Sequence, residues 1–218
     1  MAQYGLARLL WEQEVAGSNP VAPILVSNRR RTIVELLKAI FERRSIRAFL
    51  PDFIPDETII EILEAGRAAP SWANTQVCRY LIVKDNNVKA QLKETLGPSN
   101  PAREAIVQAP VLICLYAKRG LSGFKKETPV TDKGDWFMFD AGIAMEHVVL
   151  AAWSFGLGTV HVGSFDAEKA QNILGISEGF SMVAMTPVGY FGTAPRPTPR
   201  KPLSELVCID QYGREFIT

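Results

Sequence analysis

Cysteine and histidine are scarce in this chain of 218 residues. It has three cysteines, Cys78, Cys114 and Cys208, and two histidines, His147 and His161. The cysteines are odd in number and lack a CxxC spacing, so they indicate neither a disulfide framework nor a zinc site. Two histidines are also too few for a histidine-rich metal centre. Unpaired thiols are typical of a reducing compartment, and we therefore expect a cytoplasmic protein.

The chain also lacks an excess of charge and a long hydrophobic run. Lys and Arg number 24 against 23 Asp and Glu, which gives a net charge of +1. This balance argues against binding to nucleic acid or to a membrane surface through bulk charge. No apolar run approaches the roughly 20 residues of a membrane-spanning helix. We therefore expect no nucleic-acid partner and no membrane partner.

Common catalytic and nucleotide-binding motifs are missing as well. The sequence contains no recognisable catalytic triad, carboxylate pair, Walker motif or GxGxxG. An enzyme can lack all of these when a bound cofactor carries the chemistry. We therefore expect no catalytic side chain and no metal.

The first part of the chain differs in character from the rest. WEQEVAGSNPVAP (11–23) resembles a translated tRNA gene, whereas IVELLKAIFERRSIRAF (33–49) resembles a natural protein start. We expect residues 1–33 to be an extension that arises from a misplaced start codon; a genuine N-terminal arm is the alternative. Residues 34–218 are expected to form a single domain.

Hydrophobic periodicity predicts an α+β fold. Helical patterns cover residues 33–43, 56–68, 86–96, 135–155 and 164–175, and extended apolar segments cover 80–84, 109–118, 159–163 and 181–190. Strict alternation of strand and helix is absent, so we expect a mixed central sheet flanked by helices. The segments 119–134 and 193–202 are expected to be irregular, the second because of its prolines.

A cluster of arginines lies where the first helix ends. Arg43, Arg44 and Arg47 surround the hydroxyl of Ser45. Guanidinium groups are permanently charged forks that suit oxyanions, so these four residues could hold a phosphate. The alternative is a set of solvated charges that favour a helix C-terminus.

A polar loop follows the second helix in APSWANTQ (69–76). It contains Pro70, Ser71, Trp72, Asn74 and Gln76. Hydroxyl and amide groups beside an indole face could bind the edge of a heterocycle and stack on its ring. The alternative is an ordinary loop that ends a helix.

Two later segments also suit a ligand. In GTVHVGSFD (158–166), Gly163 and Ser164 precede a helix and allow close backbone approach, although a plain strand-turn-helix is the alternative. Arg200 and Lys201 could bring another cation to a phosphate, or could belong to a surface linker.

The order of these segments resembles the nitroreductase family of FMN-dependent oxidoreductases. The matching stretches are RRSIRAF, AAPSWANTQ, DAGIAMEHVVLAAWSFGLGTVHVGSF and PVGYFGTAPRPTPRKPLSELV, and they extend over about residues 34–210. The resemblance implies a nitroreductase-like fold, an intertwined homodimer and one FMN at each subunit interface. Residues 203–218 would then wrap around the partner.

The resemblance also implies roles for the residues named above. Arg43, Arg44 and Ser45 would contact the phosphate and ribityl of FMN, with Arg47 near the pyrimidine edge of the flavin. The residues of loop 69–76 would lie against the ring bound by the other subunit. Gly163 and Ser164 would lie near flavin N5 and O4, and Arg200 would contact the phosphate.

The sequence departs from the family pattern at two places. The family loop commonly continues as Gln-Pro-Trp-Arg, whereas here Gln76 is followed by Val77, Cys78 and Arg79. His161 stands where an aromatic residue is often found. These changes are expected to affect substrate shape more than flavin binding.

The implied activity is electron transfer from NADH or NADPH through flavin N5 to a nitroaromatic, a quinone or a similar electrophilic acceptor by a ping-pong mechanism. Two alternatives remain: a specialised relative (reductive dehalogenase, enal reductase or flavin-fragmenting enzyme) and a non-catalytic flavin-binding protein. Residues 119–136 and Trp72 are expected to determine which small-molecule acceptor is used.

Overall fold

The computed structural model describes residues 36–216, all of which belong to one compact unit. The expected extension at residues 1–33 lies outside this range. Among the described residues, no helix is long and apolar enough to cross a membrane.

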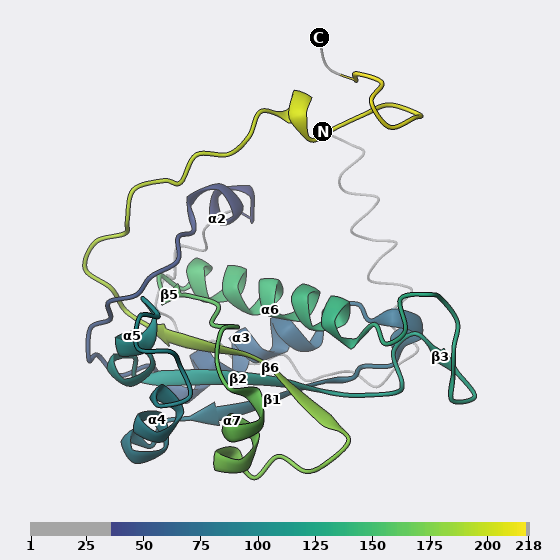
Figure 1. The fold of residues 1–218 in the computed structure, drawn as a ribbon. Helices are drawn as coiled ribbons and strands as arrows, with labels where there is room; N and C mark the ends of the chain where they lie inside the picture. Colours follow the sequence, from purple (N-terminus) through teal and green to yellow (C-terminus); the bar gives the residue numbers. More distant parts are fainter. Residues whose placement is uncertain (1–35, 217–218) are drawn as a thin grey trace, which may run out of the picture. The chain divides into compact units, whose positions relative to one another are not determined.

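A four-stranded sheet lies at the centre of the unit (Figure 1). Its order is β1 (Cys78–Val83), β2 (Val111–Lys118), β6 (Phe180–Gly189) and β5 (Gly158–Thr159). The three strand pairs are antiparallel, and a parallel bridge joins Ser45 to Thr159 at the β5 edge. The predicted combination of helices with a central sheet is confirmed, and the sheet is antiparallel apart from this one parallel bridge.

Helices cover both faces of the sheet (Figure 1). On one face lie α3 (Asp56–Arg67) and α6 (Phe137–Ser154), and on the other α4 (Asn86–Lys93), α5 (Arg103–Gln108) and α7 (Ala167–Leu174). Alternate residues of β2 enter the two cores: Ile113 and Leu115 pack with α3 and α6, and Leu112 and Cys114 pack on the opposite side. Burial on both faces explains why this strand reads as a continuous apolar run.

The ends of α7 follow directly from its sequence. Asp166 accepts a hydrogen bond from the backbone N–H of Lys169 at 3.0 Å, and Gly175 ends the helix with a left-handed φ of 65°. Both are common helix-end devices. The helix predicted over 164–175 therefore begins at Ala167, because Asp166 is its N-cap and has an extended backbone.

Other predictions need local correction. The strand predicted over 159–163 is regular only at Gly158–Thr159, after which Val162 makes an isolated bridge to Met185. The segment predicted as an irregular loop at 119–134 contains a small hairpin, β3 (Phe124–Lys125) and β4 (Thr128–Pro129). The short helix α5 was not predicted.

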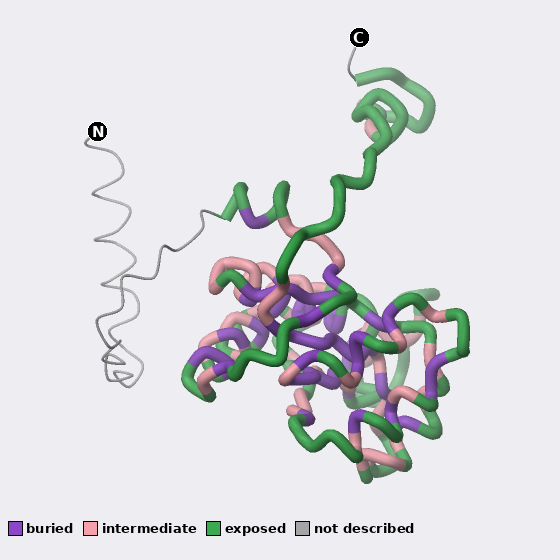
Figure 2. Tube along the Cα trace, turned by 90° about the vertical axis from the view of Figure 1, so that its left-hand side faces the viewer, coloured by how far each residue is buried: buried purple, intermediate pink, exposed green. Residues whose placement is uncertain are grey.

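Two segments expose apolar side chains. On α2 (Leu36–Glu42) only Ala39 is buried, while Leu36, Leu37, Ile40 and Phe41 are exposed. The C-terminal segment is exposed at every residue from 192 to 206, including the short helix η3 (Leu203–Glu205) (Figure 2). In isolation this amount of exposed apolar surface is unusual for a soluble chain.

Candidate functional site

Five arginines from two distant segments meet at one pocket of about 160 Å³, here called the arginine pocket. One segment is the chain that follows α2, and the other is the proline-rich segment after β6. The lining residues are Arg43, Arg44, Ser45, Arg47, Pro195, Arg196, Thr198 and Arg200. The predicted phosphate residues of both segments thus lie together.

The positive charge of the arginine pocket is not neutralised by the described part of the chain. No carboxylate lines the pocket, and no ion pair within 4 Å joins its arginines to an acid among residues 36–216. Arg44 donates instead to the carbonyls of Phe41 and Arg43, at 2.8 and 2.7 Å. Nε of Arg43 is buried without a hydrogen-bond partner in the same range. These groups fit an oxyanion, because a phosphate offers several acceptors and negative charge.

The sequence analysis did not identify Arg196 as a site residue. It stands four residues before Arg200 in the same proline-stiffened segment, and this spacing was the available signal. Lys201, the other cation considered there, pairs with Glu205 at 3.1 Å and does not line the pocket.

The backbone that follows Arg43 and Arg44 is hydrogen-bonded to β5, the strand that precedes Gly163. The backbone N–H of Ile46 donates to the carbonyl of Thr159 at 2.9 Å, next to the bridge between Ser45 and Thr159. Gly163 and Ser164 follow four and five residues later and are both exposed. A Cβ built on Gly163 would meet no atom within 4 Å. Packing therefore does not require this glycine, and the space above it is open to a ligand.

The loop between α3 and β1 has a strained backbone. Ala73, Asn74 and Gln76 have left-handed φ values of 45°, 55° and 49°. Non-glycine residues seldom adopt this conformation, and strained residues cluster at functional sites. The loop contains the short helix η2 (Trp72–Asn74), and Asn74 is exposed within it.

Asp140 of α6 anchors this loop. Its carboxylate accepts from the backbone N–H of Trp72 at 2.9 Å and from the hydroxyl of Ser122 at 2.7 Å. The hydroxyl of Ser71 accepts from the N–H of Gln76 at 2.8 Å and closes the loop. The sequence analysis missed Asp140, although an acid inside the apolar stretch FMFDAGIA was a visible signal.

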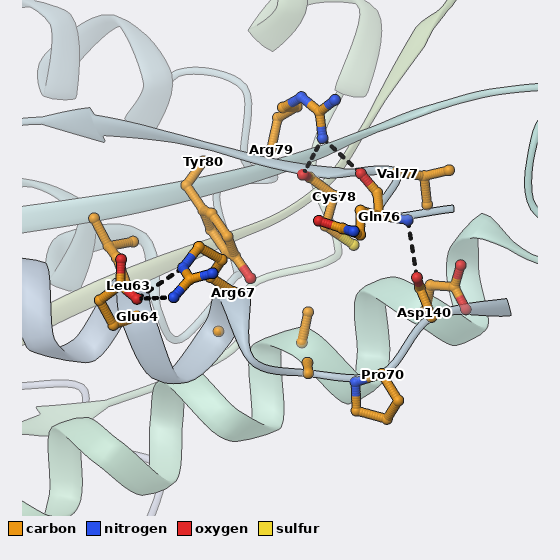
Figure 3. A pocket seen from close by; sticks show the side chains of 14 residues that line it. Leu63, Glu64, Arg67, Pro70, Gln76, Val77, Cys78, Arg79, Tyr80 and Asp140 are labelled. Carbon is orange, nitrogen blue, oxygen red and sulfur yellow. Dashed lines mark hydrogen bonds and ion pairs between the residues drawn. The ribbon is translucent and has the colours of Figure 1, made fainter. Parts of the chain in front are cut away.

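A pocket of about 360 Å³, the Cys78 pocket, lies behind the loop (Figure 3). Pro70, Ser71 and Gln76 line it together with Cys78 and Tyr80 of β1. Cys78 occupies the position where the family pattern has tryptophan, so a small side chain borders this space.

The thiol and the phenol that line the Cys78 pocket are held in their neutral form. Burial, reinforced by the charge of Asp140, raises the pKa of Cys78 to about 11. Burial also raises the pKa of Tyr80, whose hydroxyl is buried and has no hydrogen-bond partner among the described residues. At the edge of the pocket Arg67 donates to Glu64 at 2.7 Å.

A third pocket, the Trp72 pocket, has a volume of about 280 Å³ and an apolar wall. It is lined by Pro70, Ser71, Trp72, Trp136, Phe139, Asp140 and Ile143. The rings of Trp136 and Phe139 meet edge to face at 5.5 Å between centroids. The pocket thus unites Trp72 with the end of segment 119–136, the two features expected to select the acceptor.

Within the described part of a single chain, the loop and the arginine pocket remain separate. No hydrogen bond or shared pocket joins residues 70–76 to the arginines or to Gly163. From the sequence, this loop was expected to lie against a ring bound by the other subunit.

Known proteins resemble this chain in both sequence and structure. The sequence profile of the Nitroreductase family matches residues 40–105 and 98–190. The NADH dehydrogenase of Thermus thermophilus is 27% identical over 201 residues, which are 80% of this chain and 96% of that protein. An iodotyrosine deiodinase of Thermotoga neapolitana is 22% identical over 187 residues, 76% of this chain and 92% of that protein. The structure of an NADPH:FMN oxidoreductase from Vibrio harveyi complexed with NAD+ has a TM-score of 0.69 and 26% identity, covering 81% of this chain and 77% of that chain.

Proposed function

This chain belongs to the nitroreductase family, and from that premise we propose that it is an FMN-dependent oxidoreductase that passes electrons from NADH or NADPH to an electrophilic small molecule. FMN, when bound, supplies the electron transfer that this set of side chains does not provide. Donor and acceptor use the same open face in turn, which is a ping-pong arrangement. Nitroaromatics and quinones are the first acceptors to test.

The arginine pocket carries this proposal. It presents five cations without a carboxylate, and it leaves a buried guanidinium nitrogen of Arg43 unpaired among the described residues. A phosphate monoester satisfies both conditions. Arg43, Arg44, Ser45, Arg196 and Arg200 are proposed to bind the phosphate end of FMN.

The adjoining turn is proposed to receive the flavin ring. The bridge between Ser45 and Thr159 connects the phosphate residues to the chain that reaches Gly163 and Ser164. Because Gly163 has open space where a side chain would be, the backbone can approach the ring closely. Arg47 is proposed to lie near the pyrimidine edge, where its charge favours electron-rich states of the ring.

The active unit is proposed to be a homodimer. The apolar residues exposed on α2 and the C-terminal segment need a covering surface. Loop 70–76 is strained and anchored, yet it does not reach the arginine pocket of its own chain. We propose that Pro70, Ser71, Trp72, Asn74 and Gln76 meet the flavin of the partner. Light scattering should give twice the chain mass, and a monomer that still binds FMN tightly would contradict this arrangement.

Anaerobic reduction and reoxidation test the proposed function. The purified protein should be yellow, and its flavin absorbance should bleach when NADH or NADPH is added without oxygen. The bleached protein is then mixed with a nitroaromatic, a quinone or 3-iodotyrosine, and return of the absorbance identifies an acceptor. Colourless protein that FMN cannot reconstitute would overturn the proposal. Yellow protein that neither nucleotide bleaches would favour a non-catalytic flavin-binding protein.

Reductive dehalogenation is the second candidate activity. The iodotyrosine deiodinase relative supports its inclusion, since it aligns with most of this chain. Release of iodide from 3-iodotyrosine by the reduced protein, without comparable reoxidation by nitroaromatics or quinones, would favour it. The Trp72 pocket supplies the apolar contacts for an aromatic acceptor in either case.

A further inference from the structure

His161 lies on the outward face of the chain that leads to Gly163. Val162 is buried and forms an isolated antiparallel bridge with Met185, whereas His161 and Gly163 on either side of it are exposed. Alternate residues of an extended segment share a face. The imidazole therefore stands on the same side as the open space above Gly163.

Two side chains hold this imidazole. The bridge between Val162 and Met185 brings Thr186 of β6 next to His161, with 3.3 Å between Nδ1 and the Thr186 hydroxyl oxygen. On the other side, Nε2 lies 3.8 Å from a carboxylate oxygen of Glu146 on α6, within ion-pair range. Thr186 is fully buried. A hydroxyl both donates and accepts, so Thr186 suits the neutral and the protonated ring.

The charges around His161 keep its partner ionised. The interaction with His161 is the largest cause that lowers the pKa of Glu146, and the charges of Arg43 and His147 act in the same direction against the effect of burial. The Glu146 carboxylate is therefore an anion throughout the range, from pH 8 to pH 5, in which histidines in general gain a proton.

We propose that His161 is a chargeable residue of the flavin-ring site that, when protonated, favours binding of reduced over oxidised FMN, and that Glu146 and Thr186 position it. The inference rests on the proposed function, which puts the ring at Gly163. The anionic form of reduced flavin carries a negative charge that the oxidised ring lacks, so a nearby imidazolium stabilises that form selectively. A neutral imidazole does not, so the preference requires the protonated ring.

The positioning is testable without any flavin. In the apoprotein, ¹⁵N chemical shifts of the His161 ring show which nitrogen carries the proton. At pH 8.5 we expect the Nε2–H form, with Nε2–H directed to Glu146 and Nδ1 accepting from Thr186. Thr186→Val should mix the two tautomers, while Thr186→Ser should retain the wild-type form. An unchanged tautomer in Thr186→Val would overturn the assigned role of Thr186.

The charge effect is measured as separate dissociation constants for oxidised and reduced FMN at pH 5.5 and pH 8.5. At pH 5.5, His161→Gln should weaken binding of reduced FMN by about five- to tenfold and change that of oxidised FMN by less than about twofold. A tenfold change corresponds to about 30 mV in the two-electron potential. At pH 8.5 the variant should match the wild type.

His147→Gln is the matched control. Nδ1 of His147 lies 3.1 Å from the backbone carbonyl of Ala65 in α3, so this ring contacts a helix and not the segment around Gly163. The control variant should leave both constants unchanged at both pH values. A loss in His161→Gln that is equal in both redox states or at both pH values would indicate a purely structural role and overturn the inference. If wild-type protein binds no FMN, the proposed function fails, and the tautomer experiment still decides whether Glu146 and Thr186 position His161.

Discussion

The arginine pocket and the Cys78 pocket place polar groups in opposite electrostatic situations. In the arginine pocket five permanent cations converge with no lining carboxylate. In the Cys78 pocket a thiol and a phenol remain neutral because burial raises the pKa of each. The arginine pocket therefore has guanidinium groups without a carboxylate in its lining, whereas in the Cys78 pocket burial keeps the thiol and the phenol from ionising.

This difference indicates what each region can bind. Guanidinium groups cannot discharge by losing a proton, so the arginine pocket favours an anionic ligand. The Cys78 pocket does not need an added charge, because its thiol and phenol are neutral at physiological pH and its charged lining residues include both acids and bases, with Arg67 paired to Glu64. We therefore assign the recognition of a charged cofactor to the first pocket, and we expect the second to respond to the size of side chains and ligands.

The largest expected effect concerns thiol reactivity in the Cys78 pocket. Burial raises the pKa of Cys78 from 9.0 to about 11, so at pH 7.5 this thiol has about 100-fold less thiolate than an unperturbed one. Alkylation by iodoacetamide, followed by peptide mass spectrometry, should therefore label exposed Cys208 at least about 100-fold faster than Cys78. Cys208→Ser should remove the fast phase alone. Equal labelling of Cys78 and Cys208 would remove the contrast between the two pockets.

In the arginine pocket the expected effect is on cofactor affinity. Arg43→Ala and Arg200→Ala should each weaken FMN binding by about 1.5–3 kcal/mol, the usual contribution of a charge-assisted hydrogen bond. Fluorescence titration of the apoprotein with FMN measures this change. Arg67→Ala is the control from the Cys78 pocket, since Arg67 already pairs with Glu64. Unchanged affinity in both arginine-pocket variants would contradict the phosphate assignment.

The fold was predictable where local chemistry determines it. The cap of Asp166 and the stop at Gly175 are encoded within α7 itself, and the apolar run of β2 reflects burial on both faces. The strand expected at 159–163 was too long, because periodicity does not show where a chain leaves the ladder. The exposed apolar residues of α2 show another limit of periodicity: an apolar stripe on a helix predicts that the stripe is buried, but not which surface covers it.

The candidate site was predictable only in part. The order of motifs linked Arg43, Arg44 and Ser45 to Arg200, and the structure brings them to one pocket. Asp140 was missed because the loop it holds is 68 residues away; its place in an apolar stretch indicates a buried acid but does not show which groups it binds. Long-range hydrogen bonds of this kind arise from packing, which a single sequence does not display.

Asp140 itself provides a test of the loop that borders the Cys78 pocket. Asp140→Ala leaves the N–H of Trp72 and the hydroxyl of Ser122 without an acceptor in a buried place, so the free energy of unfolding should fall by about 1–3 kcal/mol. Urea denaturation measures this loss. Asp132→Asn, on the exposed surface, should change stability by less than about 0.5 kcal/mol. A similar small change in Asp140→Ala would show that the loop does not depend on this anchor.

Substitutions at Gly158 and Gly163 distinguish a role in packing from a role in ligand binding. A Cβ on Gly158 would lie 2.6 Å from Ile46 and 2.7 Å from Phe191, so Gly158→Ala should destabilise the protein by about 1–3 kcal/mol. A Cβ on Gly163 meets nothing within 4 Å, and Gly163→Ala should change stability by less than about 0.5 kcal/mol.

If the flavin ring lies above Gly163, the methyl group of Gly163→Ala should nevertheless weaken FMN binding. Thermal unfolding of the apoprotein and FMN titration, done on both variants, distinguish these effects. A Gly163→Ala protein with normal stability and normal FMN affinity would move the ring away from this turn, while the phosphate assignment at the arginines would stand.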